Sequence, residues 1–241
     1  MDSGEAMTAG TVWGIGVGPG DPELITLKAL RLLRAVPVIA YPAPEQGDSF
    51  ARGVAAPHLP GGQTEIAIRM AIGDGQFPKD EVYDAAAERI AAHADAGRDV
   101  AVLCEGDPLF YGSFIYLYMR LAGRCAVTVV PGVSSLTACA AAAGMPLVTR
   151  NDVLSVLPGP MPEAELRACL ATGEAAAIVK VGRHFAKVRR VLGQEGRLNE
   201  AHYVERATLG AERVMKLTEA GGDSAPYFSM ILVPRRGGPK P

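Results

Sequence analysis

Two sharp glycine-containing turns, each following a short run of β-forming residues, constrain the fold of this chain more than any other feature. Residues 12–21 read VWGIGVGPGD, and residues 104–108 read CEGDP. Turns of this kind between a strand and a helix are typical of a sheet whose strands are joined by crossover helices. Ligands of such open sheets bind at the carboxyl ends of the strands, where these turns lie. We therefore predict an α/β fold whose binding site includes both turns.

The first turn resembles a dinucleotide-binding fingerprint but lacks its spacing. Counted from Gly14, the third required glycine is replaced by Pro19, and counted from Gly16 it is replaced by Asp21. Pro19 also has no N–H to donate to a pyrophosphate. These departures argue against a nucleotide-binding oxidoreductase. The density of glycine still favours close approach of some ligand to the backbone.

Composition narrows the class of protein and its partners. The chain has 241 residues, of which 49% are hydrophobic, and its formal net charge is −2. A sizeable core is therefore available, and nothing in the charge favours nucleic acid as a partner. No apolar run is long enough to span a membrane, and Met1–Gly10 does not read as a signal peptide. The cysteines and histidines show no metal-ligand spacing, so we expect no metal site, reduced thiols and a cytoplasmic location.

The first part of the chain alternates strand and helix patterns, which predicts parallel βαβ units with flanking helices. The expected strands are Thr11–Gly16, Val36–Tyr41, Asp99–Cys104 and Ala126–Val130, and the expected helices are Glu23–Arg34, Lys79–Ala96, Phe110–Ala122 and Ser134–Ala143. Gly97 and Gly144 follow two of these helices at positions suited to a left-handed C-terminal cap. The stretch from Pro42 to Pro78 is expected to be a long, glycine- and proline-rich connection with a possible strand at Glu65–Ala71.

The pattern changes after Gly144, where the last strands follow closely on one another. The expected strands there are Asp152–Leu157, Ala175–Val181, Ala201–Glu205, Arg213–Leu217 and Tyr227–Pro234, with helices at Pro162–Thr172 and His184–Leu192. This order predicts a mixed sheet. We therefore expect two α/β domains, 11–144 and 150–235, with the active site in the cleft between them.

A third turn, Pro131–Ser135, follows another expected strand and opens an alanine-rich helix. Ser134 or Ser135 can serve simply as the helix N-cap, or its hydroxyl can face the same ligand as the first two turns. In the second turn, Glu105 and Asp107 place two carboxylates beside the expected site. Carboxylates there suit a cationic ligand or a sugar hydroxyl, and Phe110 could pack on a flat base.

Taken together, the three turns occur in the order and spacing of a known family. Over roughly residues 11–235, the chain resembles the S-adenosylmethionine-dependent tetrapyrrole methyltransferases of the cobalamin pathway. Further stretches are most similar to the subfamily that methylates C20 of precorrin-2, and they are residues 41–49, 103–114, 180–185 and 203–207.

The resemblance implies two α/β domains, a homodimer, and S-adenosylmethionine as methyl donor with S-adenosylhomocysteine as product. Position by position, it carries over cofactor contacts to Pro19, Gly106, Asp107, Phe110, Ser134, Ser135, Val181, Ala207 and Met230. Asp107 is in addition the candidate catalytic residue. The carboxylates of the tetrapyrrole substrate are expected to pair with Arg69, Lys180 and Arg183.

Several alternatives stay open at this point. The substrate could carry cobalt, as in the anaerobic branch, or another ring position could be methylated. Diphthine synthase and a non-catalytic tetrapyrrole carrier are more distant alternatives. Methyl transfer to an electron-rich carbon depends mainly on alignment, which explains why no catalytic base is conspicuous in the sequence. The acceptor of the C20 proton could be Asp107, Glu105, Tyr111 or water.

Overall fold

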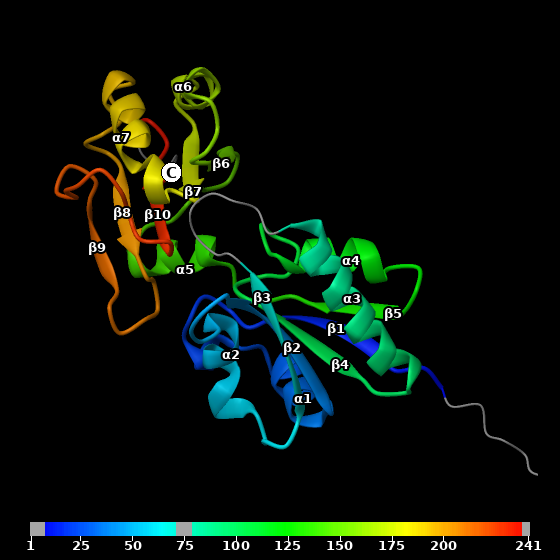
Figure 1. Cartoon of the computed structure of the whole chain (residues 1–241). Helices are drawn as coiled ribbons and strands as arrows, with labels where there is room; N and C mark the ends of the chain where they lie inside the picture. Colours follow the sequence, from blue (N-terminus) through cyan, green and yellow to red (C-terminus); the bar gives the residue numbers. More distant parts are fainter. Residues whose placement is uncertain (1–7, 71–78, 238–241) are drawn as a thin grey trace, which may run out of the picture. The chain divides into compact units, whose positions relative to one another are not determined.

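The computed structural model describes residues 8–70 and 79–237. It divides into two compact units, one ending at Ser134 and the other beginning at Ser135. Each unit is a sheet packed against helices, so the predicted α/β class is confirmed. Figure 1 shows both units and the labels used below.

The first unit is built on a fully parallel sheet with the strand order β3-β2-β4-β1-β5. Its described elements are β1 (Thr11–Gly16), η1 (Pro22–Leu24), α1 (Leu27–Ala35), β2 (Val38–Pro44), α2 (Phe50–Ala55), η2 (Ala56–His58), β3 (Thr64–Met70), α3 (Asp80–Asp95), β4 (Val100–Cys104), α4 (Phe114–Leu121) and β5 (Ala126–Val130). The four strands expected from the alternating pattern are all present, and β1 and β5 have the predicted bounds.

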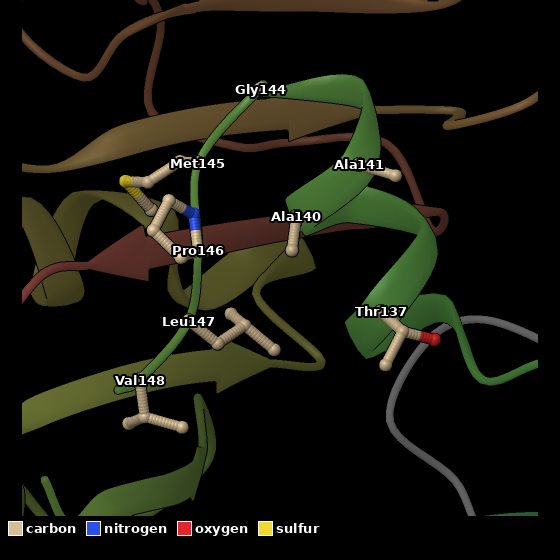
Figure 2. A pocket seen from close by; sticks show the side chains of 8 residues that line it. All are labelled: Thr137, Ala140, Ala141, Gly144, Met145, Pro146, Leu147 and Val148. Carbon is tan, nitrogen blue, oxygen red and sulfur yellow. The ribbon is translucent and has the colours of Figure 1, made fainter. Parts of the chain in front are cut away.

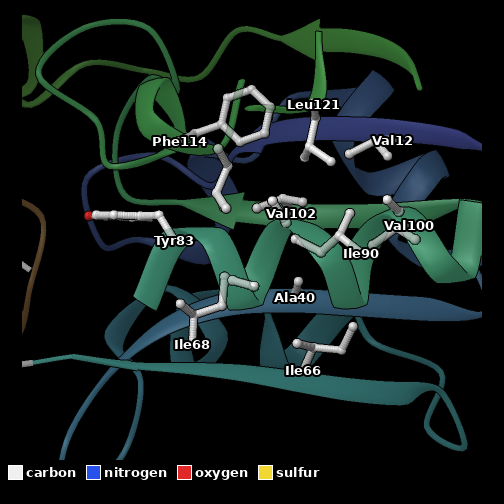
Figure 3. Close-up of a cluster of buried hydrophobic side chains, with 14 of the residues drawn as sticks. Val12, Ala40, Ile66, Ile68, Tyr83, Ile90, Val100, Val102, Phe114 and Leu121 are labelled. Carbon is white, nitrogen blue, oxygen red and sulfur yellow. The ribbon is translucent and has the colours of Figure 1, made fainter. Parts of the chain in front are cut away.

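Strand β4 is buried along its whole length because helices cover both faces of the sheet. Val100 and Val102 point to the face covered by α3 and α4, where they pack with Ile90 and Phe114 (Figure 3). Leu103 points to the opposite face, in the cluster that contains residues of α1 and α2. Burial on two faces explains why β4 reads as a continuous apolar run, as is usual for a parallel strand.

Two helices of this unit are shorter than expected, for local reasons. The expected helix Glu23–Arg34 is split, since Ile25 and Thr26 are extended and the Thr26 hydroxyl accepts the Ala29 N–H at 3.3 Å as a new N-cap. The expected helix Phe110–Ala122 begins only at Phe114, after Tyr111, whose φ of +56° is left-handed and non-helical. Gly97, with φ +74°, takes the left-handed conformation predicted for it.

The stretch Pro42–Pro78 is more structured than expected. It contains the end of β2, the helices α2 and η2, and β3, which is the edge strand beside β2. The prediction of one long connection was therefore wrong, because the glycine and proline residues separate short elements instead of replacing them. The possible strand Glu65–Ala71 corresponds to β3, while Ala71 and the rest of the stretch up to Pro78 lie outside the described residues.

The second unit has a mixed sheet with the strand order β6-β7-β10-β8-β9. Its described elements are α5 (Ser135–Ala142), β6 (Leu154–Pro158), α6 (Glu163–Ala171), β7 (Ala175–Val179), η3 (Gly182–His184), α7 (Phe185–Gln194), β8 (His202–Glu205), β9 (Arg213–Lys216) and β10 (Ser229–Val233). β6 and β7 are parallel, whereas β10 runs antiparallel to both β7 and β8. The predicted mixed sheet is confirmed.

Helix α5 packs on the second sheet, although the expected domain limits assign it to the first domain. Ala138 and Cys139 are buried in a cluster with Val179 and Met230. The helix is apolar and alanine-rich on all sides, so its sequence does not show which sheet it faces. Gly144 has φ +59° and ends this helix as predicted, but the two units divide ten residues earlier.

Candidate functional site

In the first unit, three loops leave the carboxyl ends of the neighbouring strands β4, β1 and β5. The loop after β1 bonds directly to the loop after β4. The Val17 N–H donates to the Cys104 carbonyl at 2.9 Å, and Gly18 and Gly106 exchange backbone hydrogen bonds of 3.3 and 2.8 Å. The two turns that the sequence predicted to share a site are therefore joined by their backbones.

Glycines in β1 and in the third loop are required by contacts within the protein. A Cβ atom on Gly16 would lie 2.5 Å from the Gly106 carbonyl oxygen, and one on Gly132 would lie 2.1 Å from that same oxygen. A Cβ on Gly14 would lie 2.3 Å from the Phe114 ring. For Gly14 and Gly16 of the first turn, contacts within the protein are therefore enough to explain why glycine is present, and ligand approach to this turn stays a prediction. Gly18 has more room, since its Cβ would meet only Leu24, at 3.4 Å.

Asp107 ties the second loop to the third. Its Oδ1 accepts the Leu109 N–H at 2.9 Å, and its Oδ2 accepts the Gly132 N–H at 3.1 Å. We call this pair of bonds the Asp107 clasp. Because both oxygens already accept backbone donors, the carboxylate fixes the geometry of the loops on which Gly106 and Ser134 lie.

Glu105, two residues earlier, has a different environment. Glu105 is half-buried, and burial raises the pKa of its carboxyl group above the ordinary value. The preceding residue, Cys104, is fully buried, and burial raises the pKa of its thiol to about 12. Cys104 is therefore a neutral packing residue, and its thiolate is not available as a nucleophile near neutral pH.

Exposed aromatic rings stand beside the clasp. Phe110 is 38% exposed and Tyr111 is 44% exposed, and their ring centroids lie 5.1 Å apart in an edge-to-face arrangement. The left-handed conformation of Tyr111, at φ +56°, gives the loop the sharp bend that carries both rings. Pro19 and Ser134 are half-buried at the ends of the first and third loops.

Arg69 lies on the edge strand β3 of the same unit and already has structural partners. Its Nη1 donates to the carbonyl oxygens of Pro44, Gly47 and Glu45 at 2.9, 3.3 and 3.4 Å. The exposed guanidinium group thus holds the loop that follows β2. Sequence reasoning missed this role, since only the register of β2 and β3, in which Arg69 lies opposite Ala43, brings its side chain next to the loop that follows β2.

In the second unit, basic residues follow two strands that end at one edge of the sheet. β7 and β8 both run antiparallel to β10, so their carboxyl ends lie at the same edge. Lys180 follows β7 and is exposed, and Arg183 lies in η3 just beyond it. Arg206, which follows β8, was not among the predicted site residues. Lys180 and Arg206 are both left-handed, at φ +54° and +49°, and such backbone outliers are often found at functional sites.

The other predicted cofactor residues of this unit lie on different faces of the sheet. Val181 is fully buried in the cluster formed with α6 and α7. Ala207 and Met230 are buried in the cluster that includes α5. Any contact of Val181 with a ligand on the α5 face would therefore have to use its backbone. Ser135 is exposed at the start of α5.

A pocket of about 410 Å³ lies between α5 and the segment after it (Figure 2). Its lining consists of Thr137, Ala140, Ala141, Gly144, Met145, Pro146, Leu147 and Val148. No side chain in this lining is titratable, so the pocket can provide shape and apolar contact but no acid–base chemistry. None of its residues was predicted as a site residue.

Two absences hold for residues 8–70 and 79–237. No group of three or more His, Cys, Asp or Glu side chains in these ranges could hold a metal ion. Within the same ranges, no helix has the length and apolarity needed to cross a membrane.

Known proteins are similar to this chain in sequence and in fold. The family model of the tetrapyrrole (corrin/porphyrin) methylases matches residues 11–221. A precorrin-2 C(20)-methyltransferase from Sinorhizobium sp is 47% identical over 233 residues, which cover 93% of this chain and 95% of that protein. The cobalamin biosynthesis protein CobIJ of Mycobacterium tuberculosis is 45% identical over 93% of this chain, which spans only 46% of the length of that relative.

Solved structures are similar to this chain in fold as well. Uroporphyrin-III C-methyltransferase from Thermus thermophilus, solved in complex with S-adenosylhomocysteine, is 27% identical, with a TM-score of 0.67. The match covers 93% of this chain and 97% of that one. The chain belongs to the tetrapyrrole (corrin/porphyrin) methylase family.

Proposed function

We propose that this protein transfers a methyl group from S-adenosylmethionine to C20 of precorrin-2 in cobalamin biosynthesis. The observation that carries the proposal is the 47% identity, across nearly the whole of both chains, to a precorrin-2 C(20)-methyltransferase. When bound, S-adenosylmethionine supplies an electrophilic methyl group on a sulfonium cation. The tasks left to the protein are binding, alignment and removal of the C20 proton.

The residues at the carboxyl edge of β4, β1 and β5 suit this cofactor. Carboxylates of Glu105 and Asp107 provide negative charge beside the loops, as a sulfonium cation requires. The exposed ring of Phe110 offers an apolar face, and Gly18 leaves room for close approach to the backbone. The buried thiol of Cys104 supports direct transfer without a covalent enzyme intermediate, because it stays protonated at working pH.

The tetrapyrrole substrate carries many carboxylates, for which Arg69, Lys180 and Arg183 are the proposed partners. Within residues 8–70 and 79–237, Arg69 uses only Nη1 to hold the loop after β2, so its Nε and Nη2 groups can donate to a substrate carboxylate. Lys180 and Arg183 are both exposed. Replacing Arg69 with alanine should raise the KM for precorrin-2, and an unchanged KM would contradict this role.

A cytoplasmic homodimer is also part of the proposal. Its support is the family resemblance, the unpaired state of the described cysteines and exposed apolar side chains such as Met119, which is 72% exposed on α4. Analytical ultracentrifugation checks the dimer, for which a sedimentation coefficient of a 25.2 kDa monomer at micromolar concentration would be contrary evidence.

The function is tested by incubating the purified chain with S-adenosylmethionine and enzymically made precorrin-2 under anaerobic conditions. Mass spectrometry and NMR then report whether one methyl group is added and at which ring position. One methyl at C20 is the expected result. Transfer only to the cobalt-loaded substrate, or to another ring position, would keep the family and replace the substrate. A chain that binds the tetrapyrrole but not S-adenosylhomocysteine would be a carrier.

A further inference from the structure

We propose that two copies of this chain pair through the outer face of α4, so that the dimer interface adjoins the candidate site. The inference rests on the homodimer of the proposed function and names the surface that forms it. This surface, which we call the α4 patch, consists of the exposed side chains of Leu109, Tyr111, Tyr116, Tyr118 and Met119. The first two lie in the loop that leads from β4 into α4, and the other three lie on the helix (Figure 1).

Exposed apolar side chains are concentrated in this one segment of the chain. The described residues include eleven large hydrophobic side chains that are exposed, and six of these fall within residues 109–119. The sixth, beside the five of the α4 patch, is Phe110, whose ring packs edge-to-face on Tyr111. Exposed apolar side chains that gather in one place mark an interaction surface, whereas single scattered ones are normal.

Helical geometry places Met119 at the centre of the exposed side of α4. Phe114 and Leu121 are buried and belong to the side of the helix that packs on the sheet. With about 3.6 residues per turn, Met119 points away from that side, and it is 72% exposed. Tyr116 lies one turn before Met119, and Tyr118 flanks it. The outer face of α4 is therefore apolar and aromatic.

The α4 patch carries no charge of its own. Residues 109–119 contain no Asp, Glu, Lys, Arg or His. The two arginines that follow are held by α3, since Arg120 donates to Asp84 at 2.6 Å and Arg124 forms an ion pair with Glu88. In a two-fold symmetric dimer each patch faces its own copy, so an unpaired charge there would meet its like. A neutral patch bordered by ion pairs within the chain avoids that repulsion.

These features favour a second copy of the chain over other macromolecules. A lipid surface or a nucleic acid is attracted by unpaired Lys and Arg side chains. The arginines beside the α4 patch instead face carboxylates of α3. The buried centre of a protein–protein interface is enriched in aromatic residues and methionine and depleted in charged ones, which is the composition of the α4 patch.

The size of the α4 patch suits the centre of a dimer interface. At about 200 Å² for a fully exposed side chain of this size, its five side chains, which are 37–72% exposed, present roughly 500 Å² to solvent. Two such patches facing each other would remove roughly 1,000 Å² from water, the area at which specific interfaces begin. The polar residues around the patch would supply the rim.

The α4 patch begins at the candidate site. The Leu109 N–H donates to Asp107 Oδ1 at 2.9 Å, so the first residue of the patch takes part in the Asp107 clasp. A partner seated on the patch would therefore contact the loop that holds the clasp and carries Phe110. Pairing of two copies would stabilise this loop in the conformation that the candidate cofactor contacts require.

The test compares Met119→Asp with Leu27→Asp, which introduces the same charge at an exposed position of the same unit. Leu27 is 84% exposed on α1, a helix that packs on the opposite face of the sheet. By sedimentation velocity over a range of concentrations, we expect Met119→Asp to raise the dimer dissociation constant about 30-fold or more, because two carboxylates enter the centre of the interface. Leu27→Asp should sediment like the unmodified protein. Since both side chains are exposed, neither variant should change the circular dichroism spectrum.

Methionine oxidation provides a measurement that needs no substitution. In a single copy, Met119 should react with peroxide faster than Met161, which is half-buried in the second unit. In the dimer, Met119 should be covered and should react more slowly than Met161. Peptide mass spectrometry of the unmodified protein, at concentrations above and below the dissociation constant, measures both rates.

The outcomes separate this inference from the proposed function. If the unmodified chain is a monomer, the homodimer and this inference both fail, while the methyl-transfer assay still decides the activity. If the chain is a dimer but Met119→Asp dissociates no more readily than Leu27→Asp, the two copies pair through another surface and the inference is overturned. It is also overturned if Met119 remains the faster-reacting methionine in the dimer.

Discussion

The two sheets carry loops at their carboxyl edges that are held in place by different means. In the first unit the loops after β1 and β4 are joined backbone to backbone, and Gly16 and Gly132 both lie against the Gly106 carbonyl. In the second unit side chains do more of this work. Buried Glu205 accepts the hydroxyl of Tyr203 at 2.8 Å and lies 3.3 Å from the guanidinium group of Arg213.

The same contrast appears in backbone conformation. Among the described residues with positive φ, the non-glycine ones are Tyr111 in the first unit and Arg150, Lys180, Arg206 and Thr208 in the second. In the first unit Gly16 and Gly132 lie where a side chain has no room, whereas the second unit keeps four larger residues in a left-handed conformation. Glycine substitutions should therefore be severe in the first unit, and side-chain deletions should be graded in the second.

The largest effect is expected for Gly132→Ala. The added Cβ would lie 2.1 Å from the Gly106 carbonyl oxygen, a backbone atom that cannot move without breaking its loop. We expect a loss of about 4–5 kcal/mol in the free energy of unfolding, measured by urea denaturation. The control is Gly193→Ala on α7, where a Cβ meets nothing within 4 Å and where alanine should stabilise by about 0.5–1 kcal/mol. Equal effects at the two positions would contradict the importance of backbone contacts in the first unit.

Arg197→Met should come next. The fully buried guanidinium group donates to the carbonyl oxygens of Glu174 at 2.9 Å, of Leu170 at 3.3 Å and of Pro234. One side chain thus links α6 to the residue before β7 and the residue after β10. Methionine fills similar volume but leaves these acceptors without a donor, at an expected cost of about 3 kcal/mol. The exposed Arg190→Met is the comparison. If Arg197→Met lowers the free energy of unfolding by less than about 1 kcal/mol, buried side chains matter less in the second unit than we infer.

Tyr203→Phe tests the buried network at a finer level. The change removes the hydroxyl that donates to Glu205 and keeps the ring that packs against Phe185, with centroids 5.2 Å apart. We expect a loss of about 1–1.5 kcal/mol by urea denaturation at pH 7. Tyr118→Phe, at an exposed position on α4, should change stability by less than about 0.5 kcal/mol. If the two variants have the same free energy of unfolding, the bond between Tyr203 and Glu205 adds no stability. Glu205 would then not be one of the residues that hold the loop after β8.

The smallest expected effect is a gain. Arg150 is exposed and has φ +43°, so glycine at this position should relieve strain and raise the free energy of unfolding by up to about 1 kcal/mol. Gly123 provides the reverse experiment, since it has φ +93° and a Cβ added there would meet nothing within 4 Å. Gly123→Ala should cost a similar amount. If Arg150→Gly instead destabilises the chain, the side chain of Arg150 contributes a contact that outweighs the strain.

Much of this architecture could be predicted from the sequence, because apolar periodicity and glycine positions report local structure directly. β1 and β5 have the predicted bounds, and Gly97 and Gly144 end their helices as expected. Features that depend on contacts between distant segments of the chain were missed. The alanine-rich α5 shows no polar face that would assign it to a sheet, and β3 is recognisable as an edge strand only through its pairing with β2.

The residues of the candidate site, which stay a prediction, are accessible to sequence reasoning to different degrees for the same reason. Its loops follow from short motifs, so Gly106, Asp107 and Ser134 could be named from the sequence alone. The partners of each side chain depend on contacts between distant segments. The bond from Gly132 to Asp107, the carbonyls held by Arg69 and the burial of Val181 on the face opposite Ala207 belong to this class.

The close packing of the Gly106 carbonyl against two glycines also limits how this site can change during evolution. Neither Gly16 nor Gly132 can accept a side chain while the three loops keep their spacing. New specificity must then arise from substitutions that point away from the junction, at positions such as Glu105, Phe110 and Tyr111. Relatives acting on different tetrapyrroles should therefore share the glycines and differ in the side chains around them, and a library restricted to those surrounding positions should be the most economical route to altered substrates.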